Sequence, residues 1–210
     1  MGPPGVGKGT QAARLKDRLG VPHVSTGDML RGSMQAGTPL GKKVREYVDS
    51  GRLVPDELMG EVIAERLEKP DAAGGFVLDG FPRTLEQVRI LDRVLGRAGM
   101  TLDRVLMLQA PEEEIVRRLA GRRTCPRCGA VYHLESRPPS SPGVCDVCGG
   151  ALVQRPDDAE AVVRQRLGVY EGQTLPVAEA YRAKGILVEV NGLGDVEAVG
   201  SRLMAGLGKA

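Results

Sequence analysis

The sequence predicts an α/β protein in which a parallel β-sheet is flanked by helices. Short apolar runs of strand length alternate with longer segments in which apolar residues recur at helical spacing. One of these runs, residues 76–78, ends in Asp79-Gly80, as a buried strand would. Strands that alternate with helices in this way are typical of a parallel sheet with helical crossovers.

The predicted elements follow one another along the chain. Strands are expected at residues 21–24, 76–78, 105–108 and 187–190. Helices are expected at residues 10–19, 55–68, 85–95, 112–119 and 196–207. Two segments do not fit this alternation: residues 26–54 are polar and helical in pattern, and residues 124–154 hold a Pro/Ser-rich stretch and all four cysteines. We expect both to be insertions carried on the core.

Composition narrows the class of protein. The chain has 210 residues and a formal net charge of +2, which fits one core with small mobile subdomains and argues against nucleic acid or an anionic membrane as a partner. No stretch approaches the ~20 apolar residues of a membrane span, and no secretory signal is recognised. Arginine far outnumbers lysine. Either the planar guanidinium group is used to bind phosphate, or the excess reflects a genome-wide bias.

Residues 2–10, Gly-Pro-Pro-Gly-Val-Gly-Lys-Gly-Thr, resemble a P-loop. Its glycines let backbone N–H groups turn inward around a phosphate, and the helix that follows points its positive end at the same anion. Lys8 can reach the β- and γ-phosphates of a nucleotide. The other residues expected at the phosphates are Gly5, Gly7, Gly9 and Thr10. The alternative is a plain Gly/Pro turn.

A P-loop ordinarily follows a buried strand, but only Met1 precedes Gly2. We therefore expect the first strand to be missing from this chain, through a misplaced start or a truncation. Losing about five buried apolar side chains, at ~1.5–3 kcal/mol each, would cost roughly 8–15 kcal/mol of stability. That loss is comparable to the whole stability of a domain, ~5–15 kcal/mol. A nucleotide binder without catalysis is therefore an alternative to a working enzyme.

The four cysteines form two C-x-x-C pairs, Cys125 with Cys128 and Cys145 with Cys148. Their spacing suits a tetrahedral Zn²⁺ held by four thiolates, and a closed site of this kind is structural. Two disulfides or an Fe–S cluster are the alternatives. Close pairs also favour a reducing compartment, hence the cytoplasm. A segment with few apolar residues cannot build its own core, so the metal would supply its fold.

Further stretches resemble the adenylate kinases, a family of nucleoside monophosphate kinases. These are residues 25–31 (Ser-Thr-Gly-Asp-Met-Leu-Arg), 52–56 (Arg-Leu-Val-Pro-Asp) and 79–84 (Asp-Gly-Phe-Pro-Arg-Thr). The glycine between Lys8 and Thr10 is also the P-loop variant of that family. The resemblance runs from Gly2 almost to the C terminus. It implies a P-loop NTPase-type sheet with an AMP-binding insertion and a lid of the zinc-bearing type.

The resemblance also implies a division of the chain and a set of site residues. The core would comprise residues 1–24, 55–121 and 156–210, the AMP-binding subdomain 25–54 and the lid 122–155. The residues that match the family's AMP site are Thr26, Arg31, Arg52, Val54, Gly80, Arg83, Gln87, Arg155 and Arg166. Those that match its ATP site are Gly5, Gly7, Lys8, Gly9, Thr10, Arg118 and Arg122.

The implied reaction is the reversible, Mg²⁺-dependent transfer of the ATP γ-phosphoryl group to AMP, giving two ADP. Such chemistry needs positioning and cations and no protein nucleophile. Asp79 would hold Mg²⁺ through water, and Asp157 and Asp158 would help to fix the closed lid. The expected catalytic residues are Lys8, Arg83, Arg122, Arg155 and Arg166. Family members are commonly monomers, and we expect a monomer here.

Several rival interpretations remain at this point. A kinase of the same fold could take UMP, CMP or GMP, although Thr26 favours AMP by resemblance. A nucleic-acid-binding zinc ribbon is a second rival, but scarce aromatic residues and a near-neutral charge argue against it. The residues that we expect to be structural or on the surface are His23, His133, Arg117, Arg123 and Arg164.

Overall fold

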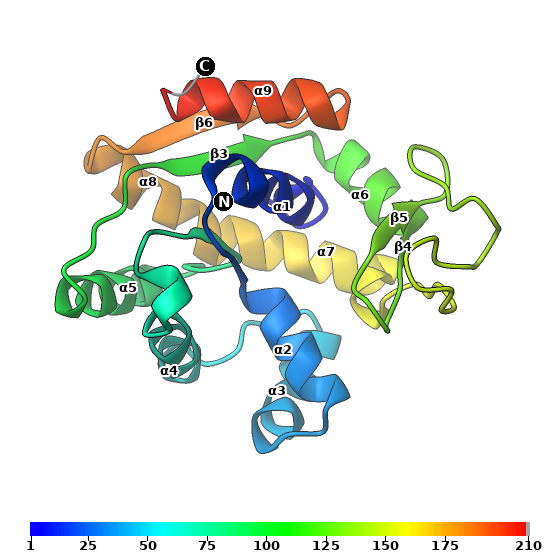
Figure 1. Cartoon of the computed structure of the whole chain (residues 1–210), viewed down its shortest axis with the longest axis horizontal. Coiled ribbons are helices and arrows are strands. Elements are labelled where there is room, and N and C mark those ends of the chain that lie inside the picture. Colours follow the sequence, from blue (N-terminus) through cyan, green and yellow to red (C-terminus); the bar gives the residue numbers. More distant parts are fainter. Residues whose placement is uncertain (209–210) are drawn as a thin grey trace.

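The computed structural model describes residues 1–208 and has the predicted α/β architecture (Figure 1). The expected last core segment, 156–210, extends two residues beyond this range. The strands are β1 (His23–Ser25), β2 (Val77–Asp79), β3 (Val105–Gln109), β4 (Arg122–Thr124), β5 (Val131–His133) and β6 (Leu187–Asn191). The α-helices are α1 (Lys8–Leu19), α2 (Thr26–Gln35), α3 (Pro39–Asp49), α4 (Asp56–Leu67), α5 (Leu85–Arg97), α6 (Glu112–Gly121), α7 (Glu160–Val169), α8 (Leu175–Ala183) and α9 (Val196–Gly206).

The parallel core strands form two pairs. β1 pairs with β2, with Val24 opposite Leu78, and β3 pairs with β6, with Met107 opposite Glu189. Among the described residues no strand joins β2 to β3. Only Met1 reaches into this interval, where its amino group donates to the Leu106 carbonyl at 2.5 Å. The predicted fold class, parallel strands flanked by helices, is confirmed, with the core strands arranged in two parallel pairs.

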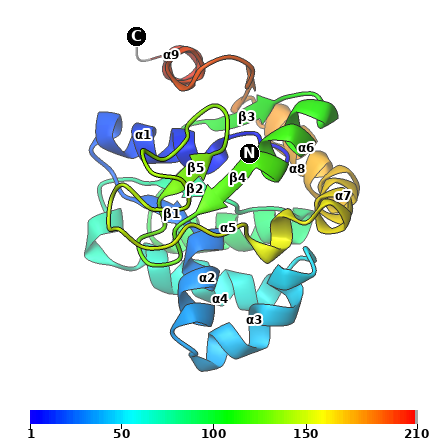
Figure 2. The same ribbon diagram turned by 90° about the vertical axis from the view of Figure 1, so that its right-hand side faces the viewer.

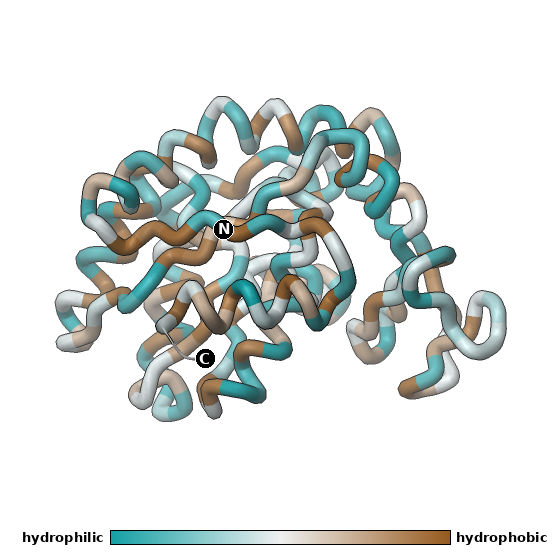
Figure 3. The backbone as a smooth tube through the Cα atoms, turned by 90° about the horizontal axis from the view of Figure 1, so that it is seen from above, coloured by the Kyte–Doolittle hydropathy of each residue, from teal (hydrophilic) through white to brown (hydrophobic). Residues whose placement is uncertain are grey.

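Helices cover both faces of these strand pairs. α1 packs against β2 and α9, and α9 lies along β6 (Figure 1). On the other side α4 packs on α5 so closely that a Cβ on Gly60 would lie 2.7 Å from Ile90. Figure 3 shows hydrophobic residues concentrated along the central strands. The largest apolar cluster, which includes Ile63 and Leu91, lies between α4, α5 and the β1–β2 pair.

The first insertion is a helical hairpin. α2 begins after Ser25, whose hydroxyl accepts from the Asp28 N–H, and α3 begins after Thr38, whose hydroxyl accepts from the Gly41 N–H. Such caps satisfy N–H groups that a helix start leaves free. Gly41 also lets the two helices touch, because a Cβ there would lie 2.1 Å from the Ser33 carbonyl oxygen. The hairpin stands away from the strands in Figures 1 and 2.

The second insertion is a lid with little regular structure. β4 and β5 pair antiparallel, with Arg123 opposite Tyr132. Cys125 and Cys128 lie in the loop between these strands, and Cys145 and Cys148 lie in the segment after β5. The lid extends from the end of α6 and returns to α7 (Figure 1). It has few strongly hydrophobic positions (Figure 3). Within the described residues no helix is long and apolar enough to span a bilayer.

The sequence prediction missed a helical segment between the lid and β6. α7, a π-helical stretch at Tyr170–Thr174 and α8 form a nearly continuous run there. Its signal was present, since Val163 and Leu167 lie four residues apart and both are buried. This run matters for the site, because it carries Arg166 beneath the phosphate loop.

Candidate functional site

The phosphate loop has the conformation that its glycines allow. Gly5 and Gly7 have φ of +78° and +101°, which side chains other than glycine rarely adopt. A Cβ on Gly5 would also lie 2.7 Å from Leu119. Helix α1 begins at Lys8, directly after the loop, so its N-terminal N–H groups face the loop's interior. The predicted phosphate contacts Gly9 and Thr10 lie in the first turn of this helix.

Lys8 folds over its own loop. Its ammonium group donates to the carbonyls of Gly2 at 2.8 Å and Pro3 at 2.7 Å. The same side chain lines a small cavity of about 60 Å³ together with Arg83 and Arg166. Three basic residues that lie far apart in the sequence therefore line one cavity.

Asp79 ends β2 at the edge of this space. Its carboxylate is nearly buried and lies 3.5 Å from the imidazole Nε2 of His23. A Cβ on Gly9 would lie 3.6 Å from the same carboxylate, so Asp79 faces the start of α1. Burial opposes ionisation, but His23 and Lys8 hold the pKa of Asp79 below its usual value. The carboxylate is therefore charged and available beside the phosphate loop.

The α2 side of the site is built around Thr26. Its hydroxyl donates to the Asp79 carbonyl at 3.2 Å. Gly80 must be glycine here, since it has φ +85° and a Cβ would lie 2.5 Å from the Thr26 hydroxyl. Arg31, one helical turn along α2, is held by the Asp28 carboxylate at 2.6 Å.

Arg83 is fixed by its surroundings. Its Nε donates to the Gly80 carbonyl at 2.7 Å, and its own carbonyl accepts from the Thr174 hydroxyl at 3.0 Å. The Gln87 amide oxygen accepts from the Arg83 N–H at 2.7 Å, and the Gln87 amide nitrogen donates to Asp56 at 2.8 Å. Gln87, predicted as an adenine contact, thus lies beside Arg83 as a buried link. Sequence reasoning missed Asp56 and Thr174, because only the fold brings them here.

The outer part of the predicted AMP site is more open. Arg52 pairs with Glu46 and stacks over the Tyr47 ring, with its guanidinium carbon 5.2 Å from the ring centre. Val54 is buried in the apolar cluster under α3 and α4. These two residues flank the turn between the hairpin and α4, on the side of the hairpin that faces the core.

Arg118 lies on the other side of the phosphate loop. Its guanidinium group donates to the Val6 carbonyl at 3.2 Å and to the Gly192 carbonyl at 3.1 Å. Glu114, one turn earlier on α6, accepts from its Nε at 2.6 Å. The flat face of Arg118 is therefore oriented beside the loop, where the predicted base of ATP would lie.

Two aspartates hold the arginines that border the lid. Arg122 donates its Nε to the Asp158 carboxylate at 2.7 Å and makes a second, shorter bond to it. Arg166 pairs with Asp157 at 2.9 Å and lies 3.6 Å from Asp158. Asp158 is 2% exposed, so its charge depends on these partners. The predicted pair Asp157 and Asp158 thus links the lid base to α7.

The basic side chains of the site repel one another. Burial is the main reason that the pKa of Lys8 is lowered to about 7. Asp79 opposes this shift, and three arginines add to it, namely Arg83, Arg166 and Arg122. Burial and Arg166 likewise lower the pKa of Arg83 to about 10. A buried group whose pKa is lowered by like charges is stabilised when an anion arrives.

Arg155 shows the same effect from the lid side. Its Nε donates to the Thr124 hydroxyl at 3.0 Å. Burial lowers its pKa to about 10, and Arg31 and Arg122 add to the shift. Arg31 of the hairpin and Arg155 of the lid are therefore near enough to interact across the cleft. The cluster as a whole is suited to polyphosphate, which carries several negative charges.

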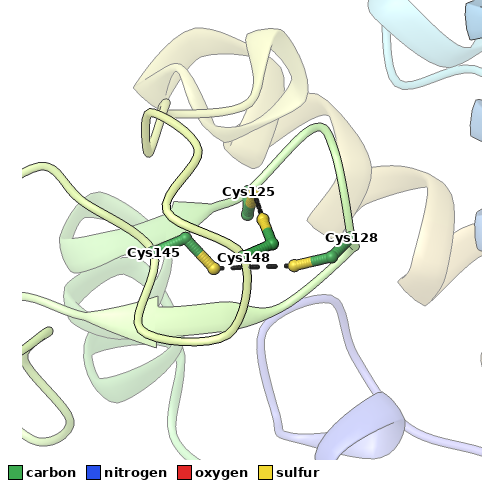
Figure 4. Close-up of side chains that lie close together, drawn as sticks. All are labelled: Cys125, Cys128, Cys145 and Cys148. Atoms are coloured by element: carbon green, nitrogen blue, oxygen red, sulfur yellow. Dashed lines mark hydrogen bonds between the residues drawn. The ribbon is translucent and has the colours of Figure 1, made fainter.

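The four cysteine sulfurs lie within 4.8 Å of one another. The sulfurs of Cys125 and Cys148 are 3.4 Å apart, and those of Cys128 and Cys145 are 3.5 Å apart. Figure 4 shows the four cysteine side chains close together in the lid. Tetrahedral Zn–S bonds of ~2.3 Å place sulfurs about 3.8 Å apart, so the cluster fits Zn²⁺ closely. The Tyr132 hydroxyl contacts the Cys145 sulfur at 3.5 Å and accepts from the Asp146 N–H, the kind of outer contact that orients a ligand.

Most of the residues that we expect to be structural or on the surface lie outside the site. Arg117 and Arg164 are exposed and pair with nearby glutamates, and Arg123 donates to backbone carbonyls. His133 accepts from two backbone N–H groups of the lid. His23 differs, because its contact with Asp79 places it at the site. No sequence spacing signals this contact, which arises from the β1–β2 pairing.

Comparison with known proteins agrees with this geometry. The adenylate kinase family model matches residues 1–186. The chain belongs to the adenylate kinase family. A relative named adenylate kinase from Archaeoglobus fulgidus is 51% identical over 209 residues, covering 100% of this chain and 96% of its own length. One from Streptomyces avermitilis is 52% identical, over 99% of this chain and 94% of its own length. A third, from Caldicellulosiruptor bescii, is 49% identical, over 99% and 97%.

Membership in this family confirms the resemblance on which the sequence analysis depended. The rival interpretation as a nucleic-acid-binding zinc ribbon has no support, since the family match includes both core and lid. The individual roles of the site residues stay predictions.

Proposed function

We propose that this chain catalyses the reversible transfer of the ATP γ-phosphoryl group to AMP, giving two ADP. The observation that carries the proposal is the convergence of Lys8, Arg83 and Arg166 on one cavity. The phosphate loop lines this cavity with Gly2 and Pro4, and the turn between α3 and α4 lines it with Gly51 and Leu53. The relatives named adenylate kinase support the same reaction.

The transfer is an in-line displacement at the γ-phosphorus. An oxygen of the AMP phosphate forms a bond to that phosphorus, and the bond from phosphorus to the β,γ-bridging oxygen breaks, which leaves ADP on each side. Negative charge spreads over the equatorial and bridging oxygens, so fixed cations stabilise it. Lys8 and Arg122 would approach the ATP phosphates. Arg83, Arg155 and Arg166 would orient the AMP phosphate and meet the transferring group.

Asp79 is the residue that fits a role toward Mg²⁺. Its charged carboxylate faces the first turn of α1, where the nucleotide phosphates would lie. Mg²⁺ binds few protein carboxylates and keeps several waters, so one aspartate that acts through water suffices. Bound Mg²⁺ neutralises phosphate charge. Asp79 would hold the ion through that water.

The lid proposal concerns structure and closure. Four sulfurs at these distances suit a structural Zn²⁺, which would hold a segment with a very small apolar core. A rigid lid carries Arg122 and Arg155 at its two ends, so its closure would place both at the phosphates and exclude water as a competing acceptor. Asp157 and Asp158 would fix the arginines in the closed position.

The remaining assignments concern specificity and setting. We expect AMP as the preferred acceptor, with Thr26, Val54 and Gln87 around its base and Arg31 and Arg52 near its phosphate and its approach path. We also expect a cytoplasmic monomer without nucleic-acid or membrane partners. Gly5, Gly7, Gly9, Thr10 and Arg118 would hold ATP, and Gly80 would let Thr26 approach Asp79.

The test is an acceptor screen with the purified chain, MgATP and each nucleoside monophosphate in turn. We expect conversion of AMP to ADP at least ~10-fold faster than that of UMP, CMP or GMP, a ratio that modest pocket contacts can supply. The reverse assay from ADP should give equal amounts of ATP and AMP. Binding of nucleotides without any conversion, at full folding by circular dichroism, would overturn the proposal in favour of a non-catalytic nucleotide binder.

A further inference from the structure

The first turn of α4 is hydrogen-bonded to the segment that carries Arg83. Asp56 begins α4, and its two carboxylate oxygens accept from the Gln87 amide nitrogen at 2.8 Å and from the Thr84 hydroxyl at 3.0 Å. The same hydroxyl accepts from the Gln87 N–H at 3.1 Å, and the Gln87 amide oxygen accepts from the Arg83 N–H at 2.7 Å. These bonds form one connected network, with Asp56 at one end and the Arg83 backbone at the other.

The Gln87 side-chain amide can take only one orientation in this network. On one side it faces the Arg83 N–H, which only donates, and on the other it faces the Asp56 carboxylate, which only accepts. The reversed amide would place two donors together on the first side and two acceptors together on the second. Gln87 is 2% exposed, so water has little room to replace either partner. Asp56 therefore determines where the amide oxygen that supports Arg83 lies.

Arg83 depends on this support because its side chain is anchored close to its own backbone. Its Nε donates to the Gly80 carbonyl at 2.7 Å, and the residue lines the cavity that Lys8 also lines. The Arg83 backbone is held at its carbonyl by the Thr174 hydroxyl and at its N–H by Gln87. A catalytic group displaced by ~1 Å loses on the order of 100-fold in rate. Loss of one backbone contact here would therefore have a measurable cost.

Charge at a helix start is a second explanation for Asp56. Negative side chains in the first turn stabilise an α-helix, because the helix dipole is positive there. Glu57 supplies the same charge in the same turn of α4, but it is exposed. The two explanations need different things from Asp56. One needs only its charge, and the other needs two acceptor oxygens at the right positions.

We propose that Asp56 is a positioning residue for phosphoryl transfer. Through Gln87 it holds the Arg83 backbone, and with it the guanidinium group, at the cavity. This inference rests on the proposed function, in which Arg83 orients the AMP phosphate. The role of Asp56 depends on where its two oxygens lie and not on their charge.

Two substitutions separate position from charge. Asp56→Asn removes the charge and keeps the geometry, because its amide oxygen can accept from Gln87 and its amide nitrogen can donate to the Thr84 hydroxyl. Asp56→Glu keeps the charge and moves the carboxylate by one methylene group. A third variant, Asp56→Ala, removes both the charge and the acceptors.

The kinetic test measures AMP phosphorylation by MgATP at a temperature well below the Tm of each variant. We expect Asp56→Asn to keep kcat within ~3-fold of the unmodified chain, and Asp56→Glu and Asp56→Ala to lower it ~10–100-fold. KM for MgATP should change by no more than ~2-fold in all three, because the phosphate loop is untouched.

The matched control is Glu57→Ala, which removes an exposed acid from the same helical turn. It should leave kcat unchanged. A larger loss of kcat in Asp56→Asn than in Asp56→Glu would show that the charge matters, and it would overturn the proposal. Normal kcat in Asp56→Ala would do the same, as would an equal loss in Glu57→Ala.

Hydrogen exchange of the Arg83 N–H, followed by NMR, tests the support without any nucleotide. Exchange should be ~10-fold faster in Asp56→Ala than in the unmodified chain, the effect of weakening one hydrogen bond. Asp56→Asn should restore the slow rate. Slow exchange in Asp56→Ala would overturn the proposal even where kcat falls. A chain that converts no AMP but shows the expected exchange rates would refute the proposed function and not the support of Arg83 by Asp56.

Discussion

The phosphate cleft and the lid each bring together side chains of one kind, but the two clusters have opposite chemistry. The cleft gathers Lys8 and several buried arginines, whose pKa values are lowered partly by one another. The lid gathers four cysteine sulfurs. Anions complete the first cluster, and a metal cation completes the second.

The two clusters differ in the contacts that their side chains make with the rest of the chain. In the cleft, Asp157 and Asp158 pair with Arg166 and Arg122, so part of the charge is already balanced. In the lid the sulfurs contact one another, the Tyr132 hydroxyl and backbone groups. A cluster with internal partners can release its ligand and remain folded. We therefore expect exchangeable substrates in the cleft and a structural ion in the lid.

The largest expected effect is loss of transfer in Arg83→Ala. We expect the rate to fall roughly 10³-fold or more, because arginines at a transferring phosphate contribute that much. Folding should survive, since the fold disfavours the charge of Arg83 and its removal relieves repulsion with Arg166. The control is Arg89→Ala on α5, the helix that begins two residues after Arg83, and it removes an exposed arginine. A coupled assay measures the turnover of both variants, and a thermal melt measures their stability. Near-normal turnover in Arg83→Ala would contradict the role of the cleft in phosphoryl transfer.

A smaller effect is expected when the metal is removed from the lid. Metal analysis should give one Zn²⁺ per chain, and chelation or Cys145→Ser should release it and unfold the lid. Transfer should then fall on the order of 100-fold, the cost of misplaced catalytic groups, while the helical content of the core persists. The control is Val147→Ser, which changes an exposed side chain between two of the cysteines. Full activity in the metal-free chain would contradict the role of the lid.

The smallest effect concerns the proton on Lys8. Its pKa is about 7 in the folded chain, against an ordinary value of 10.5. Between these values the unfolded chain binds more protons, so Lys8 makes the free protein more stable as pH rises from 7 toward 10.5. Nucleotide phosphates favour the charged form, so ATP binding at pH 8 should take up a fraction of one proton.

Calorimetry in two buffers of different ionisation enthalpy measures this uptake. Lys8→Met should abolish it, whereas Lys16→Met, an exposed lysine of the same helix, should leave it unchanged. Identical binding enthalpies in the two buffers for the unmodified chain would show that Lys8 is already charged before the nucleotide binds.

Much of the site could be predicted from sequence because its signals are local. The phosphate loop, the residues of 79–84 and the cysteine pairs each carry their chemistry within a few positions. The strands were found for a similar reason, and the predicted strand at 21–24 lies two residues early because Val21 and Pro22 precede the paired residues.

What the sequence did not predict depends on contacts between distant segments. The contact of His23 with Asp79 follows from strand pairing, and the contact of Thr174 with Arg83 follows from a helix that the prediction omitted. The arrangement of the core strands in two pairs, β1 with β2 and β3 with β6, depends on the packing of the whole chain. None of these leaves a pattern at a fixed spacing, so only the folded arrangement reveals them.

The most direct test of the account is a crystal structure of this chain with a bisubstrate mimic in which two adenosines are joined by five phosphates. We predict that Lys8, Arg83 and Arg166 all contact the central phosphates, with one adenosine beside Arg118 and the other beside Thr26. A structure in which the phosphates lie elsewhere, or in which these three side chains turn away from them, would contradict the claim that the cleft is built to transfer a phosphoryl group.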